Sequence, residues 1–259
     1  MRWLDLHTHT HLSADGATTP RALAAAARRA GLDGVAVTDH GTLEGALRVR
    51  EAAEGTGLLV IVGAEYATDV GHVLGLFLER ELRLGAAPRW PWREVLAAVR
   101  EQGGLAVLAH PTRTHRSPDP EVMAAMDGVE VYNARAEWSR FPRANARARQ
   151  AWEAARRLRG GPLLATAGSD AHFPGEIGHG RCAVAGTGDL RRALGAGTRA
   201  VLGRGTLPLY EAASQALKVT RNRDWPAAPR AAARLAFGGL RTLPHLAART
   251  AATHWEVPE

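Results

Sequence analysis

The sequence of 259 residues contains a single cysteine, Cys182. A chain with one cysteine cannot form an internal disulfide, and it cannot build a zinc site from several thiolates. A metal site in this protein would therefore have to use histidine, aspartate and glutamate side chains. The near absence of cysteine suits a reducing cytoplasm.

Long apolar stretches are also missing. No segment reaches the roughly 20 consecutive apolar residues that a membrane-spanning helix needs. The first residues do not resemble a signal peptide, because the polar run from His7 to His11 interrupts any apolar core. We expect a soluble cytoplasmic protein without a membrane partner.

Lysine is almost absent: Lys218 is the only one, and arginine carries nearly all of the positive charge. The formal net charge of +7 favours anionic ligands such as phosphate esters or nucleic acid. Many arginines, Arg156 and Arg157 among them, fall on predicted helices, where a solvated helix face explains them equally well. We expect a small anionic phosphate-ester substrate, do not favour nucleic acid as a partner, and leave the oligomeric state open.

The sequence does contain a regular alternation of short apolar runs and helical patterns. Seven runs, most of them rich in β-branched residues, predict strands that are buried on both faces, at 3–8, 34–38, 58–62, 72–78, 105–109, 129–132 and 163–167. Helices are predicted between most of them, at about 19–30, 43–54, 92–102, 120–126 and 143–158. The alternation predicts an α/β fold with a largely parallel sheet. Only a short link joins the third and fourth strands, so that pair is expected to be antiparallel or irregular.

The pattern changes after about residue 186. Helical segments are predicted at 190–194 and 210–221, and an Ala/Arg-rich segment at 231–248 is interrupted by Gly238, Gly239 and Pro244. No strand is predicted in this tail. We therefore expect a catalytic barrel over residues 1–186 and a helical extension over 187–259, which packs on the barrel and has a loose C-terminus.

Histidine and carboxylate side chains stand at the ends of six of the seven predicted strands. They are His7, His9, Asp39, His40, Glu65, His110, Glu130, Asp170 and His172. The carboxyl ends of barrel strands form one rim, where active sites are built, so we expect these side chains to converge. His72 begins the fourth strand and reaches the same rim if that strand runs in the opposite direction.

Two of these motifs have a spacing typical of metal ligands. One residue separates His7 from His9 and Asp170 from His172, so both side chains of each pair face the same side of an extended backbone. Imidazole and carboxylate suit Zn, Mn or Fe, and Glu65 is a candidate bridging carboxylate. A single His-x-His motif is more often structural, and the prediction depends on the joint placement of all the motifs on one rim.

The ordered set of motifs resembles the polymerase and histidinol phosphatase (PHP) domain family, and within it the short metal-dependent phosphoesterase branch. The matching segments are 5–9, 13–16, 37–40, 63–65, 71–75, 109–111, 129–133 and 168–172. The resemblance covers about residues 3–185. It implies a distorted seven-stranded (β/α)7 TIM-like barrel that binds two or three divalent metal ions.

Carried over position by position, the resemblance implies three groups of ligands for Mn, Zn or Fe ions. Site by site, these are His7, His9, Glu65 and Asp170; Glu65, His72 and His110; and Asp15, His40 and His172. Some family members carry histidine where this chain has Asp15. A carboxylate there makes the third site harder, which favours Mn or Fe over Zn.

The activity that the resemblance implies is hydrolysis of a phosphate ester by a hydroxide that bridges the first two metals. Asp170 is expected to accept a proton as well as to bind metal, and His172 to belong to the same catalytic site. Arg135 and Arg181 are candidate phosphate clamps, because one guanidinium can bind two oxygens, although a surface position is equally compatible with the sequence.

Three further polar residues receive provisional roles. His11 and His179 are candidates for protonating the leaving group, although exposed loop histidines would look the same in the sequence. Asp39 is a candidate for a hydrogen bond to a ligand histidine, which would fix the orientation of its ring.

Other functions stay open on the sequence alone. A metal-dependent amidohydrolase also begins with His-x-His, but it usually needs a lysine in the middle of the barrel, and Lys218 lies in the tail. A nuclease that acts on nucleic-acid ends would use the same metal chemistry. A metal-stabilised interaction module with a dead site is the alternative without catalysis.

Overall fold

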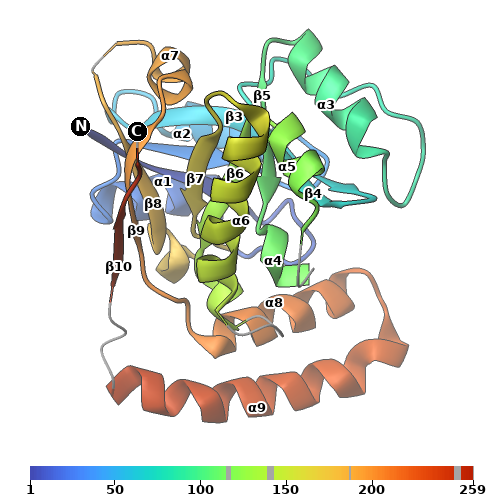
Figure 1. The fold of residues 1–259 in the computed structure, drawn as a ribbon. Coiled ribbons are helices and arrows are strands. Elements are labelled where there is room, and N and C mark those ends of the chain that lie inside the picture. The colour runs from blue at the N-terminus through green and yellow to red at the C-terminus, as the bar shows by residue number, and fades with distance from the viewer. Residues whose placement is uncertain (115–117, 139–142, 187, 248–251, 259) are drawn as a thin grey trace.

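The computed structural model describes residues 1–114, 118–138, 143–186, 188–247 and 252–258. All seven predicted strands are present in it: β1 (Arg2–Thr8), β2 (Gly34–Val37), β3 (Leu59–Thr68), β4 (Gly71–Leu76), β5 (Leu105–Ala109), β6 (Gly128–Asn133) and β7 (Leu164–Gly168). They form one curled sheet with helices on its outer side (Figure 1). The predicted α/β class is therefore confirmed.

Strand β4 runs against both of its neighbours. It pairs antiparallel with β3 through a tight turn at Asp69 and Val70, and antiparallel with β5. The pairs β1–β2, β2–β3, β5–β6 and β6–β7 are parallel. Because β4 is reversed, His72 at its start lies opposite Ala109 at the end of β5. This antiparallel arrangement brings His72 to the rim where the parallel strands end.

The end of β7 returns to β1 and brings the first and last motifs together. The backbone N–H of Asp170 donates to the carbonyl of His7, and the N–H of His9 donates to the carbonyl of Ala171, each at 2.8 Å. A glycine is required just before this junction, since a Cβ at Gly168 would collide with the Cβ of His7. The curl of the sheet thus places residues 7–9 beside residues 170–172.

Five of the six helices between these strands agree with the sequence patterns, and the four-residue helix that follows His110 was not predicted. The six helices are α1 (Pro20–Arg29), α2 (Glu44–Ala52), α3 (Trp92–Glu101), α4 (Pro111–Thr114), α5 (Pro120–Ala125) and α6 (Ala144–Arg159). Helix α1 shows why the start of a helix can be predicted from the sequence. The side chain of Thr19 accepts a hydrogen bond from the N–H of Ala22, and Pro20 occupies the first turn. Each of the helices other than α4 buries an apolar face, to which Trp152 contributes on α6.

The rest of the chain contains three strands that the sequence did not predict. Its elements are β8 (Gly180–Val184), α7 (Leu190–Gly195), β9 (Thr198–Gly203), α8 (Pro208–Arg221), α9 (Ala228–Ala247) and β10 (Thr253–Glu256), with short 3-10 turns at Ala134–Trp138, Pro174–Glu176 and Trp225–Ala227. The sheet order is β10-β9-β8-β1-β2-β3-β4-β5-β6-β7, so the sheet has ten strands rather than seven.

The expectation of a tail without strands is therefore wrong. Strands β9 and β10 are antiparallel. Strand β9 carries only the three-residue apolar run from Ala200 to Leu202 after two polar residues, and β10 has four residues, of which alternate ones are exposed. The expected interruption of the last helix is also wrong, since α9 continues through Gly238 and Gly239. Gly238 packs directly on α8, and a Cβ there would lie 2.9 Å from the Cβ of Ala212.

Within the described residues, none of the helices has the length and apolarity required to cross a membrane. The helical hairpin of α8 and α9 lies along one end of the sheet, next to α4 and the rim described below (Figure 1).

Candidate metal centre

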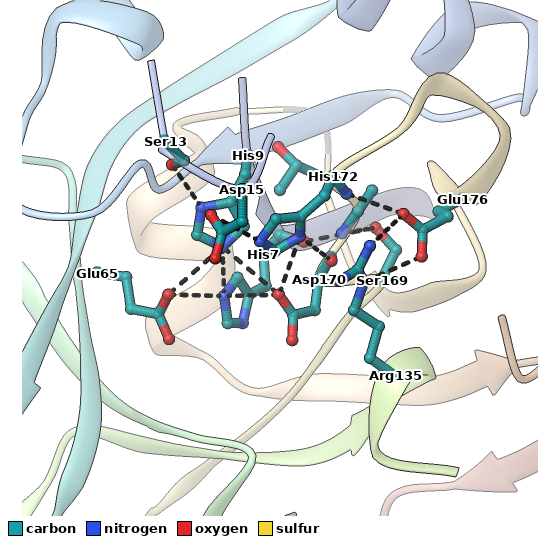
Figure 2. Close-up of polar contacts among 12 residues, drawn as sticks. His7, His9, Ser13, Asp15, Glu65, Arg135, Ser169, Asp170, His172 and Glu176 are labelled. Carbon is teal, nitrogen blue, oxygen red and sulfur yellow. Dashed lines mark hydrogen bonds and ion pairs between the residues drawn. The ribbon is translucent and has the colours of Figure 1, made fainter. Parts of the chain in front are cut away.

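The nine predicted ligand side chains converge at one rim of the sheet. Seven of them line a pocket of about 230 Å³, and these are Asp15, His40, Glu65, His72, His110, Asp170 and His172. His7 and His9 are fully buried and contact the lining residues (Figure 2). The role of each as a ligand stays a prediction, but their convergence is a property of the structure.

The pair on β1 faces two carboxylates. The Nε2 atoms of His7 and His9 lie 3.1 Å apart. Each of these nitrogens is 3.4–3.6 Å from an oxygen of Glu65 and 3.5–3.7 Å from an oxygen of Asp170. Two imidazoles and two carboxylates thus point at a common centre.

Glu65 lies between two groups of histidines. Its Oε2 is 3.0 Å from Nδ1 of His40 and also faces the β1 pair, while its Oε1 is 2.6 Å from Nδ1 of His72 and 3.1 Å from Nε2 of His110. Strand β3 carries Glu65 at a buried position, so the carboxylate is held in place rather than in a flexible loop. This arrangement is the one that a bridging carboxylate requires.

A third group forms around Asp15, in the segment that follows β1. Its Oδ1 lies 3.3 Å from Nε2 of His40 and 3.3 Å from Nε2 of His172. The same oxygen is buried. His9 lies next to this group, with its ring centroid 4.3 Å from that of His172.

The donor set fits divalent cations. Three groups of side chains, His7–His9–Asp170, His7–Glu65–His110 and His9–His40–His172, each place their ligand atoms within 4.8 Å of one another. Nδ1 of His7 faces Glu130 and Nδ1 of His9 faces Ser13, so in the neutral rings both Nδ1 atoms carry the proton and the two Nε2 lone pairs meet. A cation between them removes that repulsion, and nitrogen with carboxylate oxygen suits Zn, Mn or Fe.

The charges of the cluster are strongly coupled. Burial raises the pKa of Glu65 and of Asp170, but the surrounding imidazoles, together with Arg113 for Asp170, outweigh burial and hold both pKa values well below the ordinary range. Burial lowers the pKa of His9 to about 3, with a further contribution from His172. Burial also lowers the pKa of His40, but Glu65 and Asp15 outweigh it and raise that pKa to about 10. If His40 is a metal ligand, its ring must lose a proton when the metal binds.

Buried acceptors orient the histidines of β1. Glu130 on β6 places Oε1 3.1 Å from Nδ1 of His7, while its Oε2 accepts from the backbone N–H of His110 at 2.7 Å. Nδ1 of His9 lies 3.0 Å from Oγ of Ser13, which donates to Asp39 at 2.6 Å. Asp39, predicted to bond a ligand histidine, thus acts through Ser13.

Two candidate ligands have a left-handed backbone, which L-residues rarely adopt. His110 has φ +28° and Asp170 has φ +55°. Such conformations cost of order 1–3 kcal/mol each and persist where the surroundings enforce them. Here the N–H of His110 is held by Glu130 and the N–H of Asp170 by the carbonyl of His7.

The two arginines predicted as phosphate clamps lie in different places. Arg135 lines the pocket, but its Nε and Nη2 donate to Glu176 at 3.0 and 2.7 Å, so Nη1 is the part that faces the pocket. Arg181 lies elsewhere: its Nη1 donates to the carbonyl of Ala30, and its guanidinium lies over the ring of Trp3. Its long side chain follows the apolar surface of β1 instead of reaching the rim.

The candidate proton donors are also outside the pocket. Neither His11 nor His179 is among its lining residues. Burial, with a smaller contribution from Arg204, lowers the pKa of His179 to about 4. A buried neutral imidazole is a structural feature here.

Sequence reasoning missed four residues of the site, namely Arg113, Glu211, Gln215 and Lys218. Arg113 donates to Asp170 and to Glu211, each at 2.8 Å. Its signal was available, because it follows the His110–Pro111 motif by two residues. The other three lie on α8, whose sequence carries no motif that connects it with the rim.

Comparison with known families and proteins agrees with this architecture. The PHP domain profile matches residues 5–161, and a profile described as PHP-associated matches residues 142–198. An uncharacterized protein of Methanocaldococcus jannaschii is 33% identical over 146 residues, which cover 50% of this chain and 81% of that protein. An error-prone DNA polymerase of Cutibacterium acnes is 44% identical over 69 residues, which are 26% of this chain and only 6% of the polymerase.

Two solved structures share the fold at low sequence identity. One, described as a metal-dependent phosphoesterase of Bifidobacterium adolescentis, has a TM-score of 0.52 and 23% identity, and the match covers 66% of this chain and 88% of that one. The other, an amidohydrolase of Chromobacterium violaceum, has a TM-score of 0.51 and 19% identity over 68% of this chain and 90% of that one. Because the PHP domain profile covers more than half of the sequence, this chain belongs to the PHP domain family.

Proposed function

We propose that the protein is a metal-dependent phosphoesterase that hydrolyses a small phosphate monoester. The observation that supports this most directly is the position of Glu65, which lies between two groups of histidines and shares a pocket with the cationic Arg113 and Arg135. Ligands for more than one cation and donors for an anion thus meet in a space of about 230 Å³.

The three ligand groups would hold the cations. Bound divalent cations lower the pKa of coordinated water and neutralise charge on phosphate oxygens. The chain's own part is to present Nε2 of His7 and His9 with their lone pairs directed at the centre. Glu130 does this for His7 and Ser13 for His9, since each faces the opposite ring nitrogen.

The other residues of the pocket would bind and orient the ester. Arg113 and Nη1 of Arg135 present N–H groups on one side of the pocket, where they would neutralise the phosphoryl oxygens. The Oδ2 of Asp170 lies beside Arg113, and its Oδ1 faces the histidines, so this carboxylate is placed to accept a proton within the site. The proposal gives Arg181 no part in binding.

An amidohydrolase remains the second candidate, because of Lys218. Its position in the tail argued against this class, yet the fold brings its Nζ to 3.5 Å from Oδ2 of Asp15. The lysine comes from α8 and its side chain is 46% exposed, whereas the class usually needs one in the middle of the barrel. A substrate comparison separates the two.

The test uses purified protein stripped with a chelator and reloaded with Mn, Zn or Fe. We expect hydrolysis of p-nitrophenyl phosphate, and none of amide, lactone or oligonucleotide substrates. The His7→Ala/His9→Ala double variant should lose activity and at least one equivalent of metal, while the control His254→Ala, at an exposed position on β10, should keep both. Full activity in the double variant, or preferred cleavage of an amide, lactone or oligonucleotide, would refute the proposal.

A further inference from the structure

Helix α8 forms one wall of the pocket, although both family profiles end before it begins. The profiles stop at residue 198, and α8 starts at Pro208. Gln215 and Lys218 line the pocket, and Glu211 lies one turn before Gln215 on the same helix face. The properties of this wall therefore belong to this chain and not to the part that the profiles describe.

Glu211 holds the two arginines of the pocket. Its Oε1 accepts from Nη2 of Arg113 at 2.8 Å, and its Oε2 accepts from Nη1 of Arg135 at 3.1 Å. Each oxygen thus occupies the donor that an incoming anion would need. The carboxylate bridges the two guanidiniums as a phosphoryl group would.

Glu211 differs from the other carboxylates near these arginines. Glu176 is fully buried and also accepts from the N–H of His172 and the hydroxyl of Thr206, so it is fixed in place. Asp170 is buried among the histidines. Glu211, by contrast, is 28% exposed and lies on a helix that borders the pocket, so solvent can receive it when it is displaced.

We propose that Glu211 is a built-in competitor for the anion subsite, and that a phosphate monoester is the anion that can replace it and still reach the metal ligands. This inference rests on the proposed phosphoesterase function and deepens it. A ligand can enter only by replacing two charge-assisted hydrogen bonds. The subsite therefore accepts an anion that forms those bonds and still reaches the metal ligands.

The number of terminal oxygens decides which ester can bind both arginines and also reach the metal ligands. A monoester carries three terminal oxygens and about two negative charges, so two oxygens can replace those of Glu211 while the third faces the histidine side. A diester carries two terminal oxygens and one charge, so binding both arginines leaves no terminal oxygen for the metals. A monoester can therefore replace Glu211 and reach the metal ligands together, whereas a diester can do only one of the two.

The test is Glu211→Gln, which keeps the shape and removes the charge, with the control Glu51→Gln on the exposed side of α2. Calorimetric titration with inorganic phosphate measures the subsite without turnover, on metal-loaded and on chelated protein. We expect Glu211→Gln to bind phosphate about tenfold more tightly, the effect of one partly solvated charge.

A second variant tests the route of the effect. In an Arg113→Met background the Glu211→Gln change should have little effect on phosphate affinity, since the two residues act through one interaction. Unchanged or weaker phosphate binding in Glu211→Gln itself would overturn the inference and identify Glu211 as a residue that positions the arginines. Hydrolysis tests the proposed function separately from binding. If Glu211→Gln binds phosphate more tightly but the protein hydrolyses no ester, the role of Glu211 as a competitor is supported and the phosphoesterase function is refuted.

Discussion

Replacing Glu130 with glutamine should prevent His7 from binding a metal although His7 itself is unchanged. The carboxylate accepts on both sides: Oε1 faces Nδ1 of His7 at 3.1 Å, and Oε2 accepts from the N–H of His110 at 2.7 Å and from Nδ2 of Asn133 at 3.0 Å. A glutamine has one accepting and one donating end. The backbone N–H of His110 cannot change its role, so the amide oxygen must face it and the NH2 group must face His7.

The tautomer of His7 then reverses. With a donor opposite Nδ1, this nitrogen must accept, and the ring proton moves to Nε2, the atom 3.1 Å from Nε2 of His9. A protonated Nε2 cannot bind a cation. Loss of such a supporting acceptor typically weakens metal binding tenfold to a hundredfold, which is about 1.4–2.8 kcal/mol.

Competition with a chelator measures this effect on purified Glu130→Gln, with Glu51→Gln as a control of the same chemistry at an exposed position. The metal-free variant should also unfold about 1–3 kcal/mol more easily than wild type if the new donor finds no acceptor. Metal affinity equal to that of the wild type, in a variant that is correctly folded by circular dichroism, would refute the reasoning about the tautomer.

Three further predictions concern the surroundings of the site. Arg221→Met removes hydrogen bonds to the carbonyls of His11, Ser13 and Gly16, so the loop of Asp15 should loosen and metal affinity fall up to about tenfold, measured by the same competition. For His179, whose pKa burial lowers to about 4, the unfolded chain takes up a proton below about pH 6.5 that the folded chain refuses, so stability is lost as pH falls towards 4. Urea unfolding at pH 7.5 and at pH 5 measures the free energy of unfolding of wild type and of His179→Gln. Between the two pH values the difference between the proteins should change by about 2 kcal/mol in favour of the variant, and a difference that stays constant would contradict this. Gly168→Ala places a methyl against the Cβ of His7 and should cost about 1–3 kcal/mol, read from the midpoint of the same unfolding curves.

The parts of the site that the sequence predicted are those that local rules determine. His7 and His9 lie on one side of a buried strand, and the carboxyl ends of parallel strands share a rim, so convergence follows from the chain's order of strands and helices. The short link before His72 left two possibilities, an antiparallel or an irregular pair, and the structure has the antiparallel one. These motifs carry this information without any knowledge of the tail.

The parts that the sequence did not predict depend on packing between distant segments. Strand β9 has only three consecutive apolar residues and β10 has one, which is too little for a strand signal in the sequence, and pairing with β8 and β9 is what makes them strands. Nothing in the sequence shows which side chain Arg135 or Arg181 meets in the folded chain. Their difference is set by Glu176, which binds one, and by Trp3, which lies under the other.

Helix α8 shows that the tail cannot be separated from the chemistry of the rim. Along one helix, Glu211 binds the two arginines, Lys218 reaches Asp15, and Arg221 donates to three carbonyls of the segment that carries Asp15. The helix therefore contacts the anion side and the third ligand group at once. A shift of α8 would change the charge that faces a substrate and the position of a candidate ligand together, so the division of the chain at residue 186 separates elements that form one site.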